Sequence, residues 1–318
     1  MNSLILRLIA GRIAVALVTL LIVAVTIFCA TALLPGDVVE ILLGQAATPE
    51  AIAGLRTAMN LDQPAVVRFF LWLGNLATGD LGVSYVNNIP IADLIGSRLV
   101  NSLKLAGITA ALSVPVALTL GVTAAILRGT VYDRTISFLT IGIISVPEFM
   151  VATLAVIVFA VYLGWLPALS MTGDITTLTG LLKAFAMPVI TLSFVISAQM
   201  IRMTRAAVIE TLNAPYVEMA LLKGASRRRM VLHHALPNAL GPIVNAVALS
   251  LSYLLGGVII VETIFNYPGI AKLMLDAVST RDLPLIQSCA MIFCIAYLLL
   301  ITIADLVAIV SNPRLRRS

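Results

Sequence analysis

Six long apolar runs alternate with shorter polar segments, and they are the strongest structural signal in the chain. The runs cover residues 13–34, 103–127, 136–163, 186–208, 240–265 and 286–310. Each is close to the ~20 residues that an α-helix needs to cross ~30 Å of hydrocarbon. Because the runs are continuously apolar rather than alternating, they predict helices and not the strands of a barrel. The expected fold is an all-α membrane protein with six transmembrane helices.

Lysine and arginine are spread unevenly over the segments that connect these runs. With the N-terminus inside the cell, thirteen of the 20 basic residues fall on the cytoplasmic side. Basic residues favour that side of a membrane, so the pattern predicts that both termini are cytoplasmic. The first run is too long for the apolar part of a signal peptide, and we expect it to remain as a span.

The composition agrees with a protein whose main solvent is lipid. Charged residues make up 11% of the chain, hydrophobic residues make up 60%, and the mean hydropathy is +1.08. A soluble domain needs a more highly charged surface. The net charge of +5 could suit nucleic acid, but membrane orientation explains the charge placement more simply. Three cysteines in apolar runs show no spacing typical of a disulfide framework or a zinc site.

The segment after the first run, about 35–102, is too long to be a simple hairpin connection. Residues 49–60 and 64–77 both begin with proline, which is favoured in the first turn of a helix. We expect short extracytoplasmic helices here rather than another span. This divides the chain into residues 1–102, with the first span and the extracytoplasmic segment, and residues 103–318, a core of five spans.

Residues 213–238 form a charged segment between the fourth and fifth apolar runs. Asn213 is expected to cap a helix that has Pro215 in its first turn. Gly224 is suited to the left-handed residue that follows a helix end, and Ser226 is suited to cap a second helix. With Pro237 opening the next span, the pattern predicts a helix, a glycine turn and a second helix at the cytoplasmic surface.

Three interpretations of this segment compete. Its arginines could simply meet anionic lipid at the membrane surface. His233 and His234 could bind a metal, but adjacent helical residues point about 100° apart and no cysteine or acid cluster accompanies them. Alternatively, the segment is a docking hairpin for a cytoplasmic protein, because a short helix is marginal in water without a partner surface.

A resemblance to a known family favours docking. Glu218, Ala220, Gly224, Leu236 and Pro237 match the spacing of the EAA loop of ABC importer permeases, with departures at Met219 and His234. The chain is most similar to the dipeptide/oligopeptide/nickel permease branch. Further matching motifs run through the chain in order: residues 34–37, 61–64, 79–84, 164–167, 261–265, 267–269, 281–284 and 312–314.

The resemblance implies the type I ABC importer permease fold and a permease subunit in a bacterial inner membrane. It also implies the partners: a second homologous permease subunit, two ATPase subunits and an extracytoplasmic substrate-binding protein. The helix from Tyr216 to Lys223 would be the coupling helix, and ATPase closure would drive alternating access. Since the sequence contains no Gly-Lys pair, it has no phosphate loop, and ATP and Mg²⁺ would be bound by the ATPase subunits.

The expected substrates are di- and oligopeptides, with nickel or other small solutes such as opines as the alternative. A secondary transporter is disfavoured because internal repeats are not evident and intramembrane charges are few. An intramembrane hydrolase is disfavoured because Gly-x-Ser-x-Gly and His-Glu-x-x-His are absent. No catalytic residue is therefore expected.

Three acidic residues within or near the apolar runs are further candidates. Glu148 departs from the smaller residue usual in the family, and it either faces the translocation path or is neutralised by protonation or pairing. Glu262 either lines the outer gate or faces water. Asp305 is expected to pack at a helix end or pair with an arginine.

Overall fold

A computed structural model describes residues 2–33, 38–44, 47–170, 177–224, 226 and 229–311. These residues form helices and one isolated antiparallel bridge between Val83 and Pro90, with no strand among them. The helices are α1 (Asn2–Ala32), α2 (Val38–Leu43), α3 (Pro49–Ala58), α4 (Ala65–Thr78), α5 (Ile91–Ile126), α6 (Val131–Ile144), α7 (Glu148–Ala155), the π-helix η2 (Val156–Tyr162), α8 (Leu178–Leu212), α9 (Pro215–Leu222), the π-helix η3 (Met230–Ala235), α11 (Leu236–Ile264), α12 (Ile270–Thr280) and α13 (Leu283–Ser311).

Five helices among the described residues are long and apolar enough to cross a membrane, and they match five of the six predicted runs. They are α1, α5, α8, α11 and α13. A sixth span is reached when α6 and the α7–η2 segment are counted together. The all-helical, multi-span fold is therefore confirmed.

The third predicted run is not the continuous helix that we expected over residues 136–163. It is broken between Ile144 and Glu148, and the two parts are bent by 95°. The reason is Pro147, which has no backbone N–H and disfavours the helical conformation at the residue before it. The carbonyl of Pro147 accepts from the N–H groups of Met150 and Val151 at 3.0 and 3.2 Å, so a new helix begins there.

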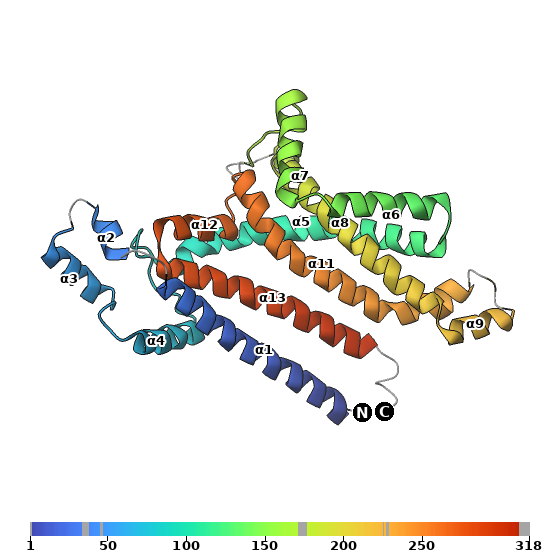
Figure 1. Cartoon of the computed structure of the whole chain (residues 1–318), viewed down its shortest axis with the longest axis horizontal. Helices are drawn as coiled ribbons and strands as arrows, with labels where there is room; N and C mark the ends of the chain where they lie inside the picture. Colours follow the sequence, from blue (N-terminus) through green and yellow to red (C-terminus); the bar gives the residue numbers. More distant parts are fainter. Residues whose placement is uncertain are drawn as a thin grey trace. The chain divides into compact units, whose positions relative to one another are not determined.

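One compact unit contains residues 1–13, 103–267 and 297–318. At its centre is α8, which is contacted by α6, α7 and α11 (Figure 1). Val208 of α8 is fully buried with Ala239 and Ile243 of α11 and Ala125 of α5. Small apolar residues let the helices approach closely, as is usual in membrane bundles.

Helices α5 and α8 approach each other closely at Gly121 of α5. A Cβ atom placed there would lie 2.8 Å from the Cβ of Thr204 and 3.0 Å from the carbonyl oxygen of Ile201. One of these atoms belongs to the backbone of α8, which cannot rotate away as a flexible side chain can. The crossing of α5 and α8 therefore requires glycine at this position.

Gly121→Ala is expected to force α5 away from α8 and to lower the free energy of unfolding by about 1–3 kcal/mol, as overpacking does. The measurement is the thermal unfolding midpoint of the assembled transporter in lipid nanodiscs. Gly107→Ala is the matched control, because it makes the same change in α5 where an added Cβ meets nothing within 4 Å. Equal midpoints for the two variants would contradict this explanation.

The second compact unit contains residues 14–102 and 268–296. The helices predicted at 49–60 and 64–77 are present as α3 and α4. Pro49 opens α3, while Pro64 lies just before α4. The apolar core of this second unit joins Ile91 and Ile95 of α5 to residues of α12 and α13. The division of the chain at residue 102 remains a prediction.

Buried polar contacts also hold the second unit together. Asp282 is 1% exposed, and its carboxylate accepts from the Ser84 hydroxyl and, at 3.1 Å, from the backbone N–H of Tyr85. Burial raises the pKa of the Tyr85 phenol. Because Ser84 and Asp282 belong to two of the sequence motifs matched above, this contact gives those motifs a structural role.

Candidate functional site

The segment 213–238 contains the predicted helix and glycine turn, with one correction. Asn213 does not cap α9; it ends α8, where its backbone N–H donates to Ile209 at 3.1 Å. The carbonyl of Ala214 instead accepts from Val217 and Glu218 at the start of α9. The predicted N-cap was wrong because α8 and α9 are separated by only two residues. Asn213 is therefore the C-cap of α8.

The turn after α9 has the predicted backbone geometry. Gly224 has φ of +82°, in the left-handed region that glycine adopts without strain. The hydroxyl of Ser226 accepts from the backbone N–H of Arg229 at 3.4 Å, as expected for a capping residue. Arg227 and Arg228 lie outside the described residues.

The second helix differs in detail from the one predicted. It is the π-helix η3, which continues directly into α11, and the N–H of Leu236 donates to the carbonyl of Val231. Pro237 is in the first turn of α11 and has no N–H of its own. The π-helical turn therefore lies directly before Pro237, which cannot donate a backbone hydrogen bond in an α-helix.

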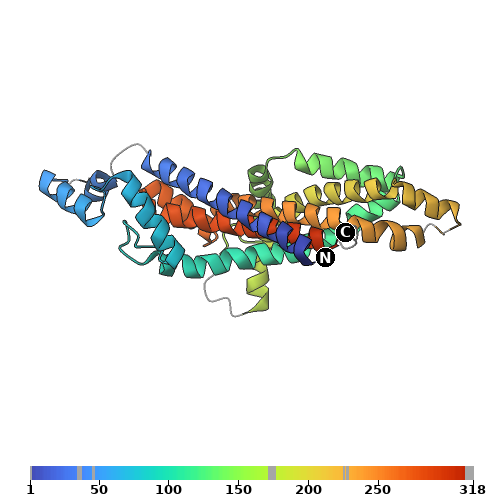
Figure 2. The ribbon, with the colours of Figure 1, turned by 90° about the horizontal axis from the view of Figure 1, so that it is seen from below.

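Helix α9 has one buried anchor and one exposed apolar face. Val217 is 1% exposed, and α9 contacts η3 and the end of α8. Tyr216, Met219 and Leu222, spaced three apart on one side, are 41%, 53% and 75% exposed. Both views place α9 beyond the ends of α8 and α11 (Figures 1 and 2). This face is apolar, projecting and uncovered by the described part of the chain.

The predicted coupling residues all lie in this region, but their exposure differs. Four are exposed: Tyr216, Glu218, Gly224 and Pro237. Ala220 and Leu236 are partly buried. Sequence reasoning missed Met219 and Leu222 as parts of the exposed face, although their spacing from Tyr216 was a readable signal.

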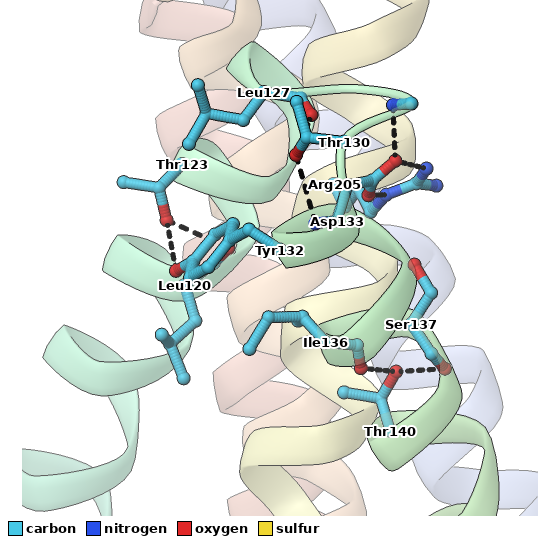
Figure 3. A network of polar contacts seen from close by, with 11 residues as sticks. Leu120, Thr123, Leu127, Thr130, Tyr132, Asp133, Ile136, Ser137, Thr140 and Arg205 are labelled. Atoms are coloured by element: carbon cyan, nitrogen blue, oxygen red, sulfur yellow. Dashed lines mark hydrogen bonds and ion pairs between the residues drawn. The ribbon is translucent and has the colours of Figure 1, made fainter.

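A buried ion pair joins α6 to α8, and sequence reasoning missed it. Asp133 is 4% exposed, and its two carboxylate oxygens accept from Nε and Nη2 of Arg205 at 2.6 and 2.9 Å (Figure 3). The backbone N–H of Gly129 donates to the same carboxylate at 2.9 Å. A planar guanidinium that meets both carboxylate oxygens fixes orientation as well as distance.

The turn between α5 and α6 is tied to both of its helices. The hydroxyl of Thr130 donates to the carbonyl of Leu127 at 2.7 Å and accepts from the N–H of Asp133 at 3.4 Å. The hydroxyls of Thr123 and Tyr132 lie 2.9 Å apart (Figure 3). Together with Arg205, these contacts hold the start of α6 against α8, seven residues before α8 ends near α9.

Glu148 is the first residue of α7 and lines a cavity of about 530 Å³. Its Oε1 atom is buried and has no hydrogen-bond partner among the described residues. A Cβ atom added to Gly257 of α11 would clash with this oxygen. Among the residues that the structure describes, the pairing with a neighbouring helix that we considered is not seen, and the carboxylate is instead packed against glycine.

Glu262 does not face water, which corrects one of the two alternatives for it. Its side chain is 0% exposed, and its carbonyl accepts from the N–H of Tyr267 at 2.8 Å. Burial raises the pKa of Tyr267, and the neighbouring Glu262 raises it further. Glu262 is not among the residues that line the cavity at Glu148, so the structure does not bring these two acids together.

Asp305 forms the ion pair with arginine that we expected. Its Oδ2 atom lies 3.0 Å from Nη1 of Arg12, and their side chains are 24% and 54% exposed. The contact links the first and last spans within one compact unit. Such an exposed pair contributes little to stability.

The fold and this site define a multi-span membrane protein with a short helix that projects beyond two of its spans. Residues 117–317 match the family described as "Binding-protein-dependent transport system inner membrane component", and residues 5–106 match its N-terminal companion. The chain belongs to this family of ABC transporter permeases.

Relatives at about one-third identity extend over nearly the whole chain. A Brucella abortus protein named as a candidate peptide transport system permease is 34% identical over 97% of this chain and 98% of its own. The glutathione transport system permease GsiC of Escherichia coli is 35% identical over 94% and 95%. A probable peptide ABC transporter permease of Sinorhizobium fredii is 35% identical over 92% and 94%.

Proposed function

We propose that this permease imports di- and oligopeptides across the bacterial inner membrane by alternating access. The peptide substrate is supported by the names of the relatives, which include peptide and glutathione transport permeases. Nickel, opines and other small solutes remain the alternative substrates in this branch. The ion-driven secondary transporter is set aside because the chain belongs to the family of binding-protein-dependent systems.

The exposed face of α9 is the observation that supports the mode of coupling. Tyr216, Met219 and Leu222 present apolar surface that the described part of the chain does not cover. A cleft on an ATPase subunit would bury this face, and the exposed Glu218 would help to fix its orientation by ion pairing. Gly224 and the η3–α11 junction with Leu236 and Pro237 would transmit the movement to the spans.

The complete transporter would contain a second homologous permease, two ATPase subunits and an extracytoplasmic substrate-binding protein. ATP and Mg²⁺ would be held by the ATPase subunits. Both termini and α9 would be cytoplasmic, as the distribution of basic residues predicts. Residues 1–102 would supply the first span and the extracytoplasmic helices, residues 103–318 the permease core, and Glu148 and Glu262 would lie along the translocation path.

The test is ATP hydrolysis by the complete transporter reconstituted in liposomes. We expect di- to pentapeptides, presented by the binding protein, to stimulate hydrolysis and to accumulate inside. Nickel chelates and opines serve as the alternative substrates. Stimulation by nickel alone would retain the importer but overturn the peptide assignment. A complex that hydrolyses ATP but responds to no solute would contradict import by this subunit.

A further inference from the structure

The cavity at Glu148 carries opposite charges on different elements. Glu148 comes from the start of α7, Gln199 and Arg202 come from α8, and Ser250 and Tyr253 come from α11. All of these elements belong to one compact unit. Nη2 of Arg202 donates to the side-chain oxygen of Gln199 at 3.4 Å, so the guanidinium keeps further donors for other groups.

The carboxylate of Glu148 is held in an unsatisfied state. Buried polar atoms nearly always have a hydrogen-bond partner, and a buried carboxylate oxygen without one is costly. Oε1 of Glu148 has none among the described residues, and it occupies space that a side chain at Gly257 would need. Because Gly257 has no side chain, the carboxylate remains beside the cavity rather than being pushed out of it.

An ammonium group fits better than a metal ion as the missing partner of the Glu148 carboxylate. An ammonium group has three N–H donors and can be bound by a single carboxylate together with neighbouring hydroxyl or amide oxygens. A metal site needs several ligands, and the described residues include no group of three or more His, Cys, Asp or Glu that could form one. Gln199, Ser250 and Tyr253 supply additional oxygens along the cavity.

The stretch of α8 that lines the cavity is about as long as a short peptide. Along α8 the lining residues run from Val195 to Arg202, which is about 10 Å at a rise of 1.5 Å per residue. An extended tripeptide also spans about 10 Å. The planar guanidinium of Arg202 is suited to bidentate binding of a carboxylate, and the C-terminus of a peptide is such a group.

We infer that this cavity is a transit site for zwitterionic short peptides, with Glu148 receiving the N-terminal ammonium group and Arg202 the C-terminal carboxylate. The inference rests on the proposed peptide import and deepens it, because it names the chemical groups that the permease itself selects. Peptides with a blocked N-terminus would pass poorly even when the binding protein delivers them.

The experiment compares trialanine with N-acetyl-trialanine in the complete reconstituted transporter. The affinity of the binding protein for each peptide is measured separately, and uptake is recorded at equal occupancy of the binding protein. The native transporter is expected to favour the free peptide about tenfold, as a hydrogen bond between charged groups would give. Glu148→Gln is expected to abolish this preference, measured as the ratio of the two uptake rates.

A second variant tests the same carboxylate without removing it. Gly257→Ala places a methyl group against the carboxylate of Glu148, which must shift, and is expected to reduce the preference as Glu148→Gln does. Gly241→Ala, the same change in α11 where nothing lies within 4 Å, is expected to keep it. Arg202→Gln is expected to lose discrimination between trialanine and its C-terminal amide while keeping the preference for a free N-terminus.

An unchanged N-terminal preference in both Glu148→Gln and Gly257→Ala would overturn the inference while leaving peptide import intact. A native transporter that accepts both peptides equally would overturn it as well. Failure of the native transporter to respond to any peptide would instead contradict the proposed function. If Glu148→Gln does not assemble, Gly257→Ala decides the matter.

Discussion

Asp133→Asn is expected to lower the free energy of unfolding by about 3 kcal/mol. Breaking a buried ion pair costs roughly 3–5 kcal/mol, because it leaves the remaining charge without compensation. We expect the lower end because Arg205 keeps 28% of its side chain exposed, whereas Asp133 keeps 5%. The measurement is the thermal unfolding midpoint of the assembled transporter in nanodiscs, together with uptake of peptide.

Two further variants separate the ion pair from a general loss of charge. Asp305→Asn breaks the exposed contact with Arg12 and is expected to cost at most about 1 kcal/mol. Asp133→Leu combined with Arg205→Met replaces both charges by apolar groups and is expected to recover most of the stability. Equal losses for Asp133→Asn and Asp305→Asn would show that the contact in Figure 3 contributes no more than a surface pair.

Local signals in the sequence were sufficient to predict most of the fold. Continuous apolar runs identified α1, α5, α8, α11 and α13, because lipid requires long apolar helices with every backbone group satisfied. The glycine turn was predictable for a similar reason: Gly224 is needed where φ is positive. The pairing of Asp305 with an arginine followed from the cost of an isolated charge near a span.

Contacts between distant residues could not be predicted in the same way. Arg205 meets Asp133 across 72 positions, and nothing near either residue indicates the other. The contact of Glu148 with Gly257 depends on how α7 meets α11, which is set by the break at Pro147. That proline was visible in the sequence, but the apolar residues on both sides of it favoured one continuous span.

Gly224→Val is expected to uncouple ATP hydrolysis from uptake. A left-handed backbone costs an L-residue about 1–2 kcal/mol, and a β-branched residue is least tolerant of it. That is a factor of about 5–30 in the population of the turn, so the affinity for the ATPase subunits should fall by a similar factor. An added Cβ meets nothing within 4 Å, which leaves backbone strain as the cause within this chain. Two quantities are measured: the amount of ATPase subunit that co-purifies with the permease, and the peptide taken up per ATP hydrolysed.

The control for this prediction is Gly224→Asn, since asparagine tolerates positive φ far better than valine does. It should keep most of the coupling, because α9 would still leave the turn in the same direction and present Tyr216, Met219 and Leu222 as before. Gly164→Val adds strain at another glycine of positive φ, at +61°, and should affect stability but not ATPase affinity. If Gly224→Val couples normally, the turn does not set the position of α9. If valine and asparagine are equally harmful, the space beside Gly224 is filled by the partner, and side-chain size rather than backbone conformation determines coupling.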